Sequence, residues 1–200
     1  FRLILFGLFP YDELWRSAAA VTTIVIVAIL SCIPVFWTPR RIALTWGIGI
    51  TLFYILMRGG VFGLSEVTTE QWGGLSLTVF IFASVAVIGM PLSILLALGR
   101  RSELPVIRIL SSLAIDFTRS MPLLTILFTA ALIVPFVLPS WLQGDKLYRI
   151  IGAFAFFFAC YQAEIIRGGL QAIPAGQFDA AKSMGLGYWR RVWLILLPQA

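Results

Sequence analysis

The chain has 200 residues, 60% of them hydrophobic and only 12% charged, with a net charge of +6 and a mean hydropathy of +0.97. An average soluble domain has about twice this fraction of charged residues, and here the charges cluster between long uncharged runs. This pattern excludes an ordinary water-soluble domain. The runs are also far longer than barrel strands and do not alternate, which excludes a membrane β-barrel. We therefore expect an all-α, polytopic integral membrane protein.

Two candidate transmembrane helices occupy the N-terminal region, residues 1–71. The first covers residues 18–37, long enough to cross a hydrocarbon core of about 30 Å, and Pro34 is expected to kink or end it. The second, residues 42–57, is shorter and bounded by arginines, so it needs tilt or snorkelling side chains to cross. A glycine-containing loop, residues 58–71, follows.

The remaining elements lie in residues 72–200. The longest span, residues 72–98, contains Gly89 and Pro91, where we expect a bend. Residues 102–119 predict an amphipathic helix. The fourth span covers residues 122–141 and the fifth covers residues 150–166. A polar loop, residues 168–191, then leads to the start of a sixth span at residue 192. This gives about five complete transmembrane helices plus the start of a sixth. Because the chain starts at Phe1 and ends within an apolar run, we expect it to be a fragment.

Lys and Arg residues in alternate loops divide ten to five between the two sides of the membrane. The richer side is expected to be cytoplasmic, and it includes both the amphipathic helix and the loop of residues 168–191. Anchoring against the anionic cytoplasmic leaflet explains the net charge. We therefore expect the lipid bilayer as a partner and no nucleic acid.

Few residues are available for metal or catalytic chemistry. The sequence has no histidine, the commonest general base and metal ligand. Cys32 and Cys160 lie in apolar runs, where we expect small buried side chains and neither a disulfide nor a metal site. The centres of the five complete spans have no ionisable residue, which an intramembrane enzyme would need. That class is the least favoured alternative, and a channel or structural subunit is the other.

The loop of residues 168–191 has a helical pattern of its own. Residues 175–184 can form about three turns, and Gly185 fits the left-handed residue that ends a helix. Ala180 and Ala181 are small enough to let another surface approach closely. A helix this short needs tertiary contacts or a partner for stability. From these residues alone, an ordinary cytoplasmic loop remains an alternative.

The spacing of this loop resembles the cytoplasmic signature of binding-protein-dependent ABC importer permeases, EAA-x3-G-x9-I-x-L-P. The matching positions are Asp179, Ala180, Ala181, Gly185, Ile195, Leu197 and Pro198, with Gln177 just ahead of them. Asp179 replaces the usual Glu and is one methylene shorter. Residues 74–78, 119–124 and 161–169 are similar to the polar amino acid branch of the family, and the two earlier spans resemble the longer permeases of general L-amino acid uptake systems. In the family the core continues beyond the position of Ala200.

The resemblance implies a permease subunit of an ABC transporter that imports L-amino acids across the bacterial inner membrane. The loop helix would be the coupling helix, seated in a groove of a cytoplasmic ATP-binding subunit. That partner would bind the ATP, since the chain has no G-x-x-x-x-G-K-[ST] segment, and we expect no cofactor in this chain. A second permease subunit, identical or different, and a periplasmic amino-acid-binding protein would complete the complex.

A second segment, A-E-x-x-R-G-G, adds the candidates Glu164, Arg167, Gly168 and Gly169. Glu164 and Arg167 can form an i,i+3 pair at the membrane interface, while the resemblance implies a place near the inner gate. We expect Asp116 and Arg119 to belong to a solvated face. No substrate-binding residue is assigned.

Overall fold

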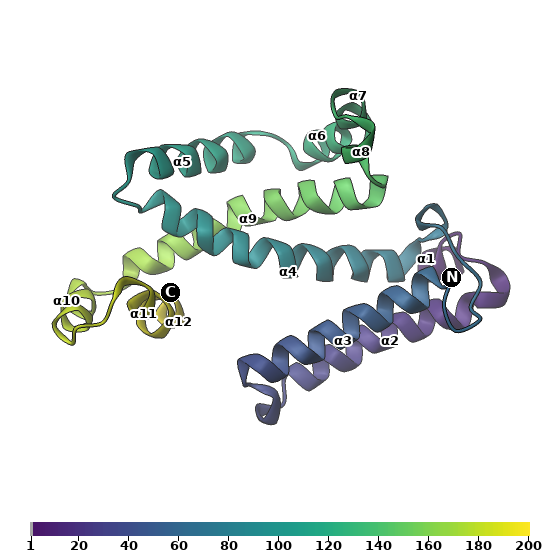
Figure 1. Cartoon of the computed structure of the whole chain (residues 1–200), viewed down its shortest axis with the longest axis horizontal. Helices are drawn as coiled ribbons and strands as arrows, with labels where there is room; N and C mark the ends of the chain where they lie inside the picture. Colours follow the sequence, from purple (N-terminus) through teal and green to yellow (C-terminus); the bar gives the residue numbers. More distant parts are fainter. Residues whose placement is uncertain (1) are drawn as a thin grey trace. The chain divides into compact units, whose positions relative to one another are not determined.

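A computed structural model describes residues 2–200, which leaves only Phe1 outside the description. All regular elements of the described residues are helical (Figure 1). The chain forms two compact units, one reaching to Ala83 and the other from Ser84 to Ala200, which divide inside one long helix. The boundary predicted between residues 71 and 72 lies shortly before this helix and stays a prediction.

The first unit is built on a pair of long helices, α2 and α3, that lie side by side (Figure 1). Its elements are α1 (Arg2–Phe6), η1 (Tyr11–Glu13), α2 (Leu14–Ser31), η2 (Pro34–Phe36), α3 (Pro39–Arg58), η3 (Thr69–Gln71) and the start of α4 (Gly74–Arg100). Both predicted spans are confirmed as helices long and apolar enough to cross a membrane.

The first span begins and ends earlier than the sequence predicts. Ile33 has an extended backbone, with φ −89° and ψ 126°, because the ring of Pro34 disfavours a helical conformation in the residue before it. The helix therefore ends at Ser31. Cys32 follows that end and is exposed, so the expectation of a buried thiol is wrong there, while it is confirmed for Cys160. Both cysteines are free.

A buried arginine ties the two helices to the loop that follows α3. Arg16 is fully buried near the start of α2. Its Nε donates to the Leu56 carbonyl at 2.8 Å, its Nη1 donates to the Ser65 carbonyl at 3.0 Å, and Glu13 pairs with it at 3.3 Å. The sequence count treated Arg16 as a charge outside the spans, whereas the structure places it inside a helix.

The second unit contains the rest of α4 and all later elements. These are α5 (Pro105–Ser120), α6 (Leu123–Phe128), η4 (Thr129–Ile133), α7 (Val134–Val137), α8 (Ser140–Gln143), α9 (Lys146–Ala172), α10 (Ala175–Ser183), α11 (Tyr188–Arg191), η5 (Val192–Leu196) and α12 (Leu197–Gln199). The amphipathic helix is confirmed as α5, which packs along α9 (Figure 1).

The predicted fourth span is broken and shorter than expected. Only Leu123–Val137 is helical without a gap, and this stretch reaches membrane-spanning length only together with α5, from which it bends by 104°. The described residues therefore contain four candidate spans, or five when the bent pair counts as one. The second count equals the predicted five, but it counts α5 as part of a span, whereas the sequence places this amphipathic helix outside the spans.

One ion pair supports counting the bent pair as a crossing. Arg100, the last residue of α4, lies 3.1 Å from Glu164, in the last third of α9. Since α4 and α9 are both long enough to span, this pair means that they end on the same side of the membrane. The chain must cross back between them, and the bent pair is the segment that can do so. The α4–α5 turn and α10 then share one side, as the Lys and Arg count predicts.

Two widened helical turns each precede a proline. The π-helical segments η4 and η5 end two residues before Pro135 and Pro198, respectively. In η5 the Leu197 amide donates to the Val192 carbonyl, five residues back. A proline has no amide hydrogen and its ring collides with the carbonyl four residues earlier. The wider turn moves that carbonyl aside, which lets the helix continue through the proline.

Candidate functional site

The loop after α9 folds into the short helix that the sequence predicts. α10 spans Ala175–Ser183, and Pro174 precedes its first residue with a non-helical backbone. The Gln177 amide donates to the Pro174 carbonyl at 3.0 Å, which closes the first turn. The nine residues of α10 are too few to be stable alone, so contacts with the rest of the unit must hold this helix in place.

The end of α10 is fixed by a glycine in the left-handed conformation. Gly185 has φ +70°, its amide donates to the Lys182 carbonyl at 3.0 Å, and the next amide, of Leu186, donates to the Ala181 carbonyl at 3.3 Å. These two bonds form a Schellman motif, which satisfies carbonyls that the helix end leaves free. The prediction for Gly185 is confirmed.

The two alanines of the signature face different ways. Gln177, Asp179 and Ala180 are exposed, whereas Ala181 is only 2% exposed and packs inside the unit. Ala181 is closely approached by its own chain, whereas Ala180 is exposed, and its approach by another molecule stays a prediction. Ala181 is small because α10 lies close against its own chain at that point.

An aromatic side chain that the sequence reading missed anchors α10. Phe178 packs against the buried cluster that contains Leu170 of α9 and Val192 of η5. The guanidinium of Arg101, just after α4, lies 5.7 Å from the centre of the Phe178 ring, a cation–π contact. Phe178 thus contacts α9 and the residue that directly follows α4. The available signal was a single large apolar residue in a helix whose other residues are small or polar.

The last signature positions lie where the chain re-enters an apolar segment. Ile195 and Leu197 are half-buried against the same cluster, and Pro198 is exposed in α12. Gly169 of α9 lies against the main chain of Ala200, where a Cβ would collide, while a Cβ on Gly168 would meet open space. Of the two candidate glycines, only Gly169 is needed for close packing.

A cluster of charged residues joins α4, α5 and α9. The Glu164 carboxylate contacts Arg167 at 2.9 Å, Arg100 at 3.1 Å and Arg119 at 3.5 Å, and its side chain is 15% exposed. Asp116 of α5 pairs with Arg100 at 2.8 Å. We call these five residues the Glu164 cluster. The predicted i,i+3 pair is confirmed. Asp116 and Arg119 are exposed, as the predicted solvated face requires, and each also has an ion-pair partner on another helix.

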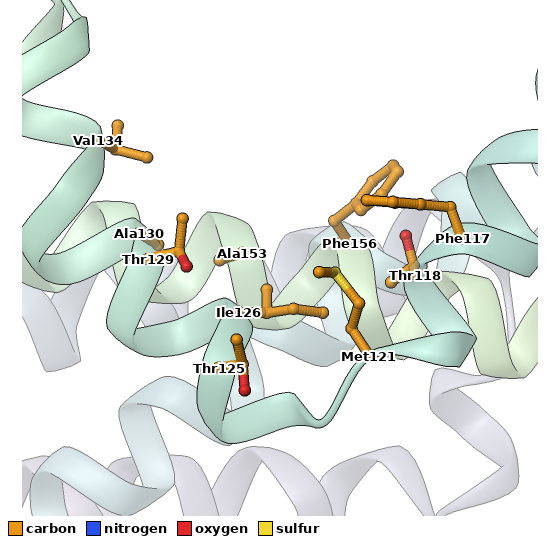
Figure 2. A pocket seen from close by; sticks show the side chains of 10 residues that line it. All are labelled: Phe117, Thr118, Met121, Thr125, Ile126, Thr129, Ala130, Val134, Ala153 and Phe156. Carbon is orange, nitrogen blue, oxygen red and sulfur yellow. The ribbon is translucent and has the colours of Figure 1, made fainter.

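A cavity of about 520 Å³ lies in the bend between α5 and α6–α7. Figure 2 shows Phe117 and Met121 at one end, Val134 at the other, and Ala153 and Phe156 on the α9 side. Its lining carries threonine hydroxyls and no charged group. The sequence gives no signal for this cavity, because it arises from the broken span. Among the described residues there is no His, Cys, Asp and Glu group that could hold a metal.

Comparisons with known proteins identify the family of this chain. The family model "Binding-protein-dependent transport system inner membrane component" matches residues 89–200. The chain is 43% identical over 206 residues to the inner membrane amino-acid ABC transporter permease protein YhdY of Escherichia coli (strain K12), covering 100% of this chain and 55% of that protein. It is 44% identical over 137 residues to the glutamate/glutamine/aspartate/asparagine transport system permease protein BztC of Rhodobacter capsulatus, covering 68% and 32%.

One solved structure shares the fold, the crystal structure of an amino acid ABC transporter with histidines, with a TM-score of 0.50 and 27% identity over 62% of this chain and 55% of that one. The chain thus spans about half, or less, of the length of these relatives. The matched residues include α5 to α12, and hence the α10 loop and all five residues of the Glu164 cluster. The intramembrane enzyme is set aside, since these relatives are transport permeases. This chain belongs to the binding-protein-dependent transport system inner membrane components, and it is a multi-pass protein of the inner membrane.

Proposed function

We propose that this chain supplies the membrane-spanning path of an ABC importer for L-amino acids, driven by ATP hydrolysis on a separate cytoplasmic subunit. The observation that carries the proposal is α10, a surface helix closed by Gly185 and anchored by Phe178, with Gln177, Asp179 and Ala180 exposed. An exposed helix with a small residue at its centre fits a helix-in-groove contact. The groove belongs to the ATPase subunit.

The proposal places the ATP-hydrolysing domain on a separate subunit. Phosphate cradling by a P-loop needs a Gly-Lys pair after a glycine-rich turn, and this sequence contains none. The proposal therefore assigns ATP binding to the partner subunit. When two ATPase subunits close on ATP, the coupling helices of paired permease subunits convert that motion into inward and outward switching. A periplasmic binding protein delivers the amino acid from the other side.

Amino acids are the proposed cargo because relatives that match this chain are named for them. We do not place the cargo in the cavity of Figure 2. A free amino acid carries an ammonium and a carboxylate, and burying charges without partners is costly. The cavity lining has no charged group to meet them.

The coupling role is tested by blocking the exposed face of α10. Ala180→Trp places a large side chain on the outer surface, where it does not disturb the fold. We expect the ATPase subunit to be lost on purification of the complex. We also expect ATP-driven uptake into vesicles to fall about tenfold, which corresponds to about 1.4 kcal/mol of lost binding free energy. The control, Thr38→Trp, lies in the exposed turn before α3 and should leave both unchanged.

Normal uptake by Ala180→Trp would refute the coupling role. A channel predicts uptake that needs no ATP, and that result would favour the alternative function. The orientation is tested separately in a Cys32→Ser background. A membrane-impermeant maleimide added outside should label Phe62→Cys, in the exposed loop after α3, and should not label Ser183→Cys in α10. The reverse labelling would put α10 on the wrong side for an ATPase.

A further inference from the structure

A second hollow, of about 280 Å³, lies between α10–α11 and the adjoining ends of α4 and α9. Its apolar lining includes Leu98 near the end of α4 and Leu170 near the end of α9. Two guanidinium groups, of Arg101 and Arg191, also line it. A site with an apolar floor and basic rim at the ends of two candidate spans lies at the level of the membrane–water interface.

One of these arginines has an unused donor. The Nε of Arg191 is buried and has no hydrogen-bond partner among the described residues. A buried donor without a partner is costly, and such groups in proteins normally find one. Arg101 is exposed, and its contact with the Phe178 ring engages the charge without using its N–H donors. The exposed Arg101 can therefore donate to an anion in the hollow, and Arg191, which also lines it, adds a second positive charge.

The charge of the lining selects the kind of anion. Glu103 lines the hollow together with the two arginines, so the three groups leave one positive charge uncompensated. A phosphodiester carries a single negative charge, which matches this uncompensated positive charge, whereas free inorganic phosphate is a mixture of monoanion and dianion at neutral pH. The apolar side chains of the lining, such as Leu98 and Leu170, can contact the first carbons of an acyl chain, which free phosphate lacks.

We infer that this hollow binds the phosphodiester headgroup of an anionic phospholipid from the cytoplasmic leaflet, through Arg101 and Arg191. The lipid fills the space between α10 and the long helices, and the positive charges of Arg101 and Arg191 attract its headgroup. The inference rests on the proposed function only for the cytoplasmic placement of α10. Its test measures lipid binding instead of uptake, so the two can fail separately.

The experiment is native mass spectrometry of the purified full-length protein titrated with phosphatidylglycerol or phosphatidylcholine. We expect Arg101→Gln and Arg191→Gln each to weaken phosphatidylglycerol binding about tenfold, the loss expected for one charge-assisted contact. The matched control is Arg190→Gln, which removes the same charge from an exposed neighbour that does not line the hollow. It should bind as the unchanged protein does. Arg101 is exposed, so this variant should fold even if Arg191→Gln does not.

Three results would overturn the inference. Equal loss in Arg190→Gln would mean general attraction to a basic surface. Equal binding of phosphatidylcholine would mean that the site does not select a negative charge. Displacement of bound phosphatidylglycerol by millimolar inorganic phosphate would mean a free-phosphate site. Retention of phosphatidylglycerol in phosphate, lost on Arg101→Gln, supports a lipid site.

Discussion

Replacing Glu164 by Gln should destabilise the second unit by removing the one carboxylate that three arginines share. The side chain contacts Arg167, Arg100 and Arg119 and is 15% exposed. An exposed ion pair contributes about 0–1 kcal/mol, and breaking a buried one costs about 3–5 kcal/mol. Because this cluster lies between those limits, we expect a loss of about 2 kcal/mol. For a chain of this size each kcal/mol shifts Tm by about 2–4 °C, which gives a fall of about 4–8 °C.

The assay is thermal unfolding of the purified protein in detergent. Asp116→Asn is the matched control, because its side chain is 55% exposed and its ion pair is with Arg100. It should cost less than about 1 kcal/mol. In a double-mutant cycle, Glu164→Gln and Arg100→Gln should couple by at least about 0.5 kcal/mol. If Glu164→Gln lowers Tm no more than Asp116→Asn does, the cluster is a set of independent surface pairs and the reasoning is wrong.

The backbone and the buried arginine give further tests. Gly185→Ala forces a Cβ into the left-handed region, which should lower the stability of the α10 end by about 1–2 kcal/mol. The measurement is amide hydrogen exchange, which should become faster in α10. The control is Gly187→Ala, at φ −63° with open space around it, which should leave the exchange unchanged. Arg16→Gln leaves its carbonyl and carboxylate partners unpaired and should cost about 3 kcal/mol or more, with faster exchange in the loop after α3; unchanged exchange there would show that the loop does not depend on it. Gly168→Ala should raise Tm, since alanine is the better helix former by about 1 kcal/mol, while Gly169→Ala should lower it because its methyl meets the Ala200 main chain; equal shifts would contradict this packing.

Local signals in the sequence predicted the α10 loop well. Gly185 could be identified as a helix end because a left-handed residue is a property of the glycine itself and of its neighbours. The surface position of α10 followed from its place between apolar runs. Which alanine faces outward could not be predicted. That depends on how far α10 is rotated about its axis, and the ring of Phe178, packed under Arg101, determines that rotation.

Contacts between distant residues were the part that the sequence could not supply. Arg100 and Glu164 are far apart in the sequence and are brought together only because the end of α4 lies beside the last third of α9. An i,i+3 spacing reveals the Glu164–Arg167 pair, but no spacing reveals its two other partners. The predicted fourth span failed for a related reason. Its composition is mostly apolar up to Trp141, but the continuous helix ends at Val137, because Leu138 and Pro139 have a non-helical backbone.

The widened turns before Pro135 and Pro198 affect how relatives of this chain should be aligned. Each contains one residue more than an ordinary turn, and one residue corresponds to a rotation of about 100° about the helix axis. A relative without the proline can lose that residue and keep the same outward faces, and its alignment will show a one-residue gap. Residues of the two chains should therefore be paired by the helix face that they occupy. Beyond Ile133 or Leu196, the paired residue in such a relative then lies one position earlier in its sequence.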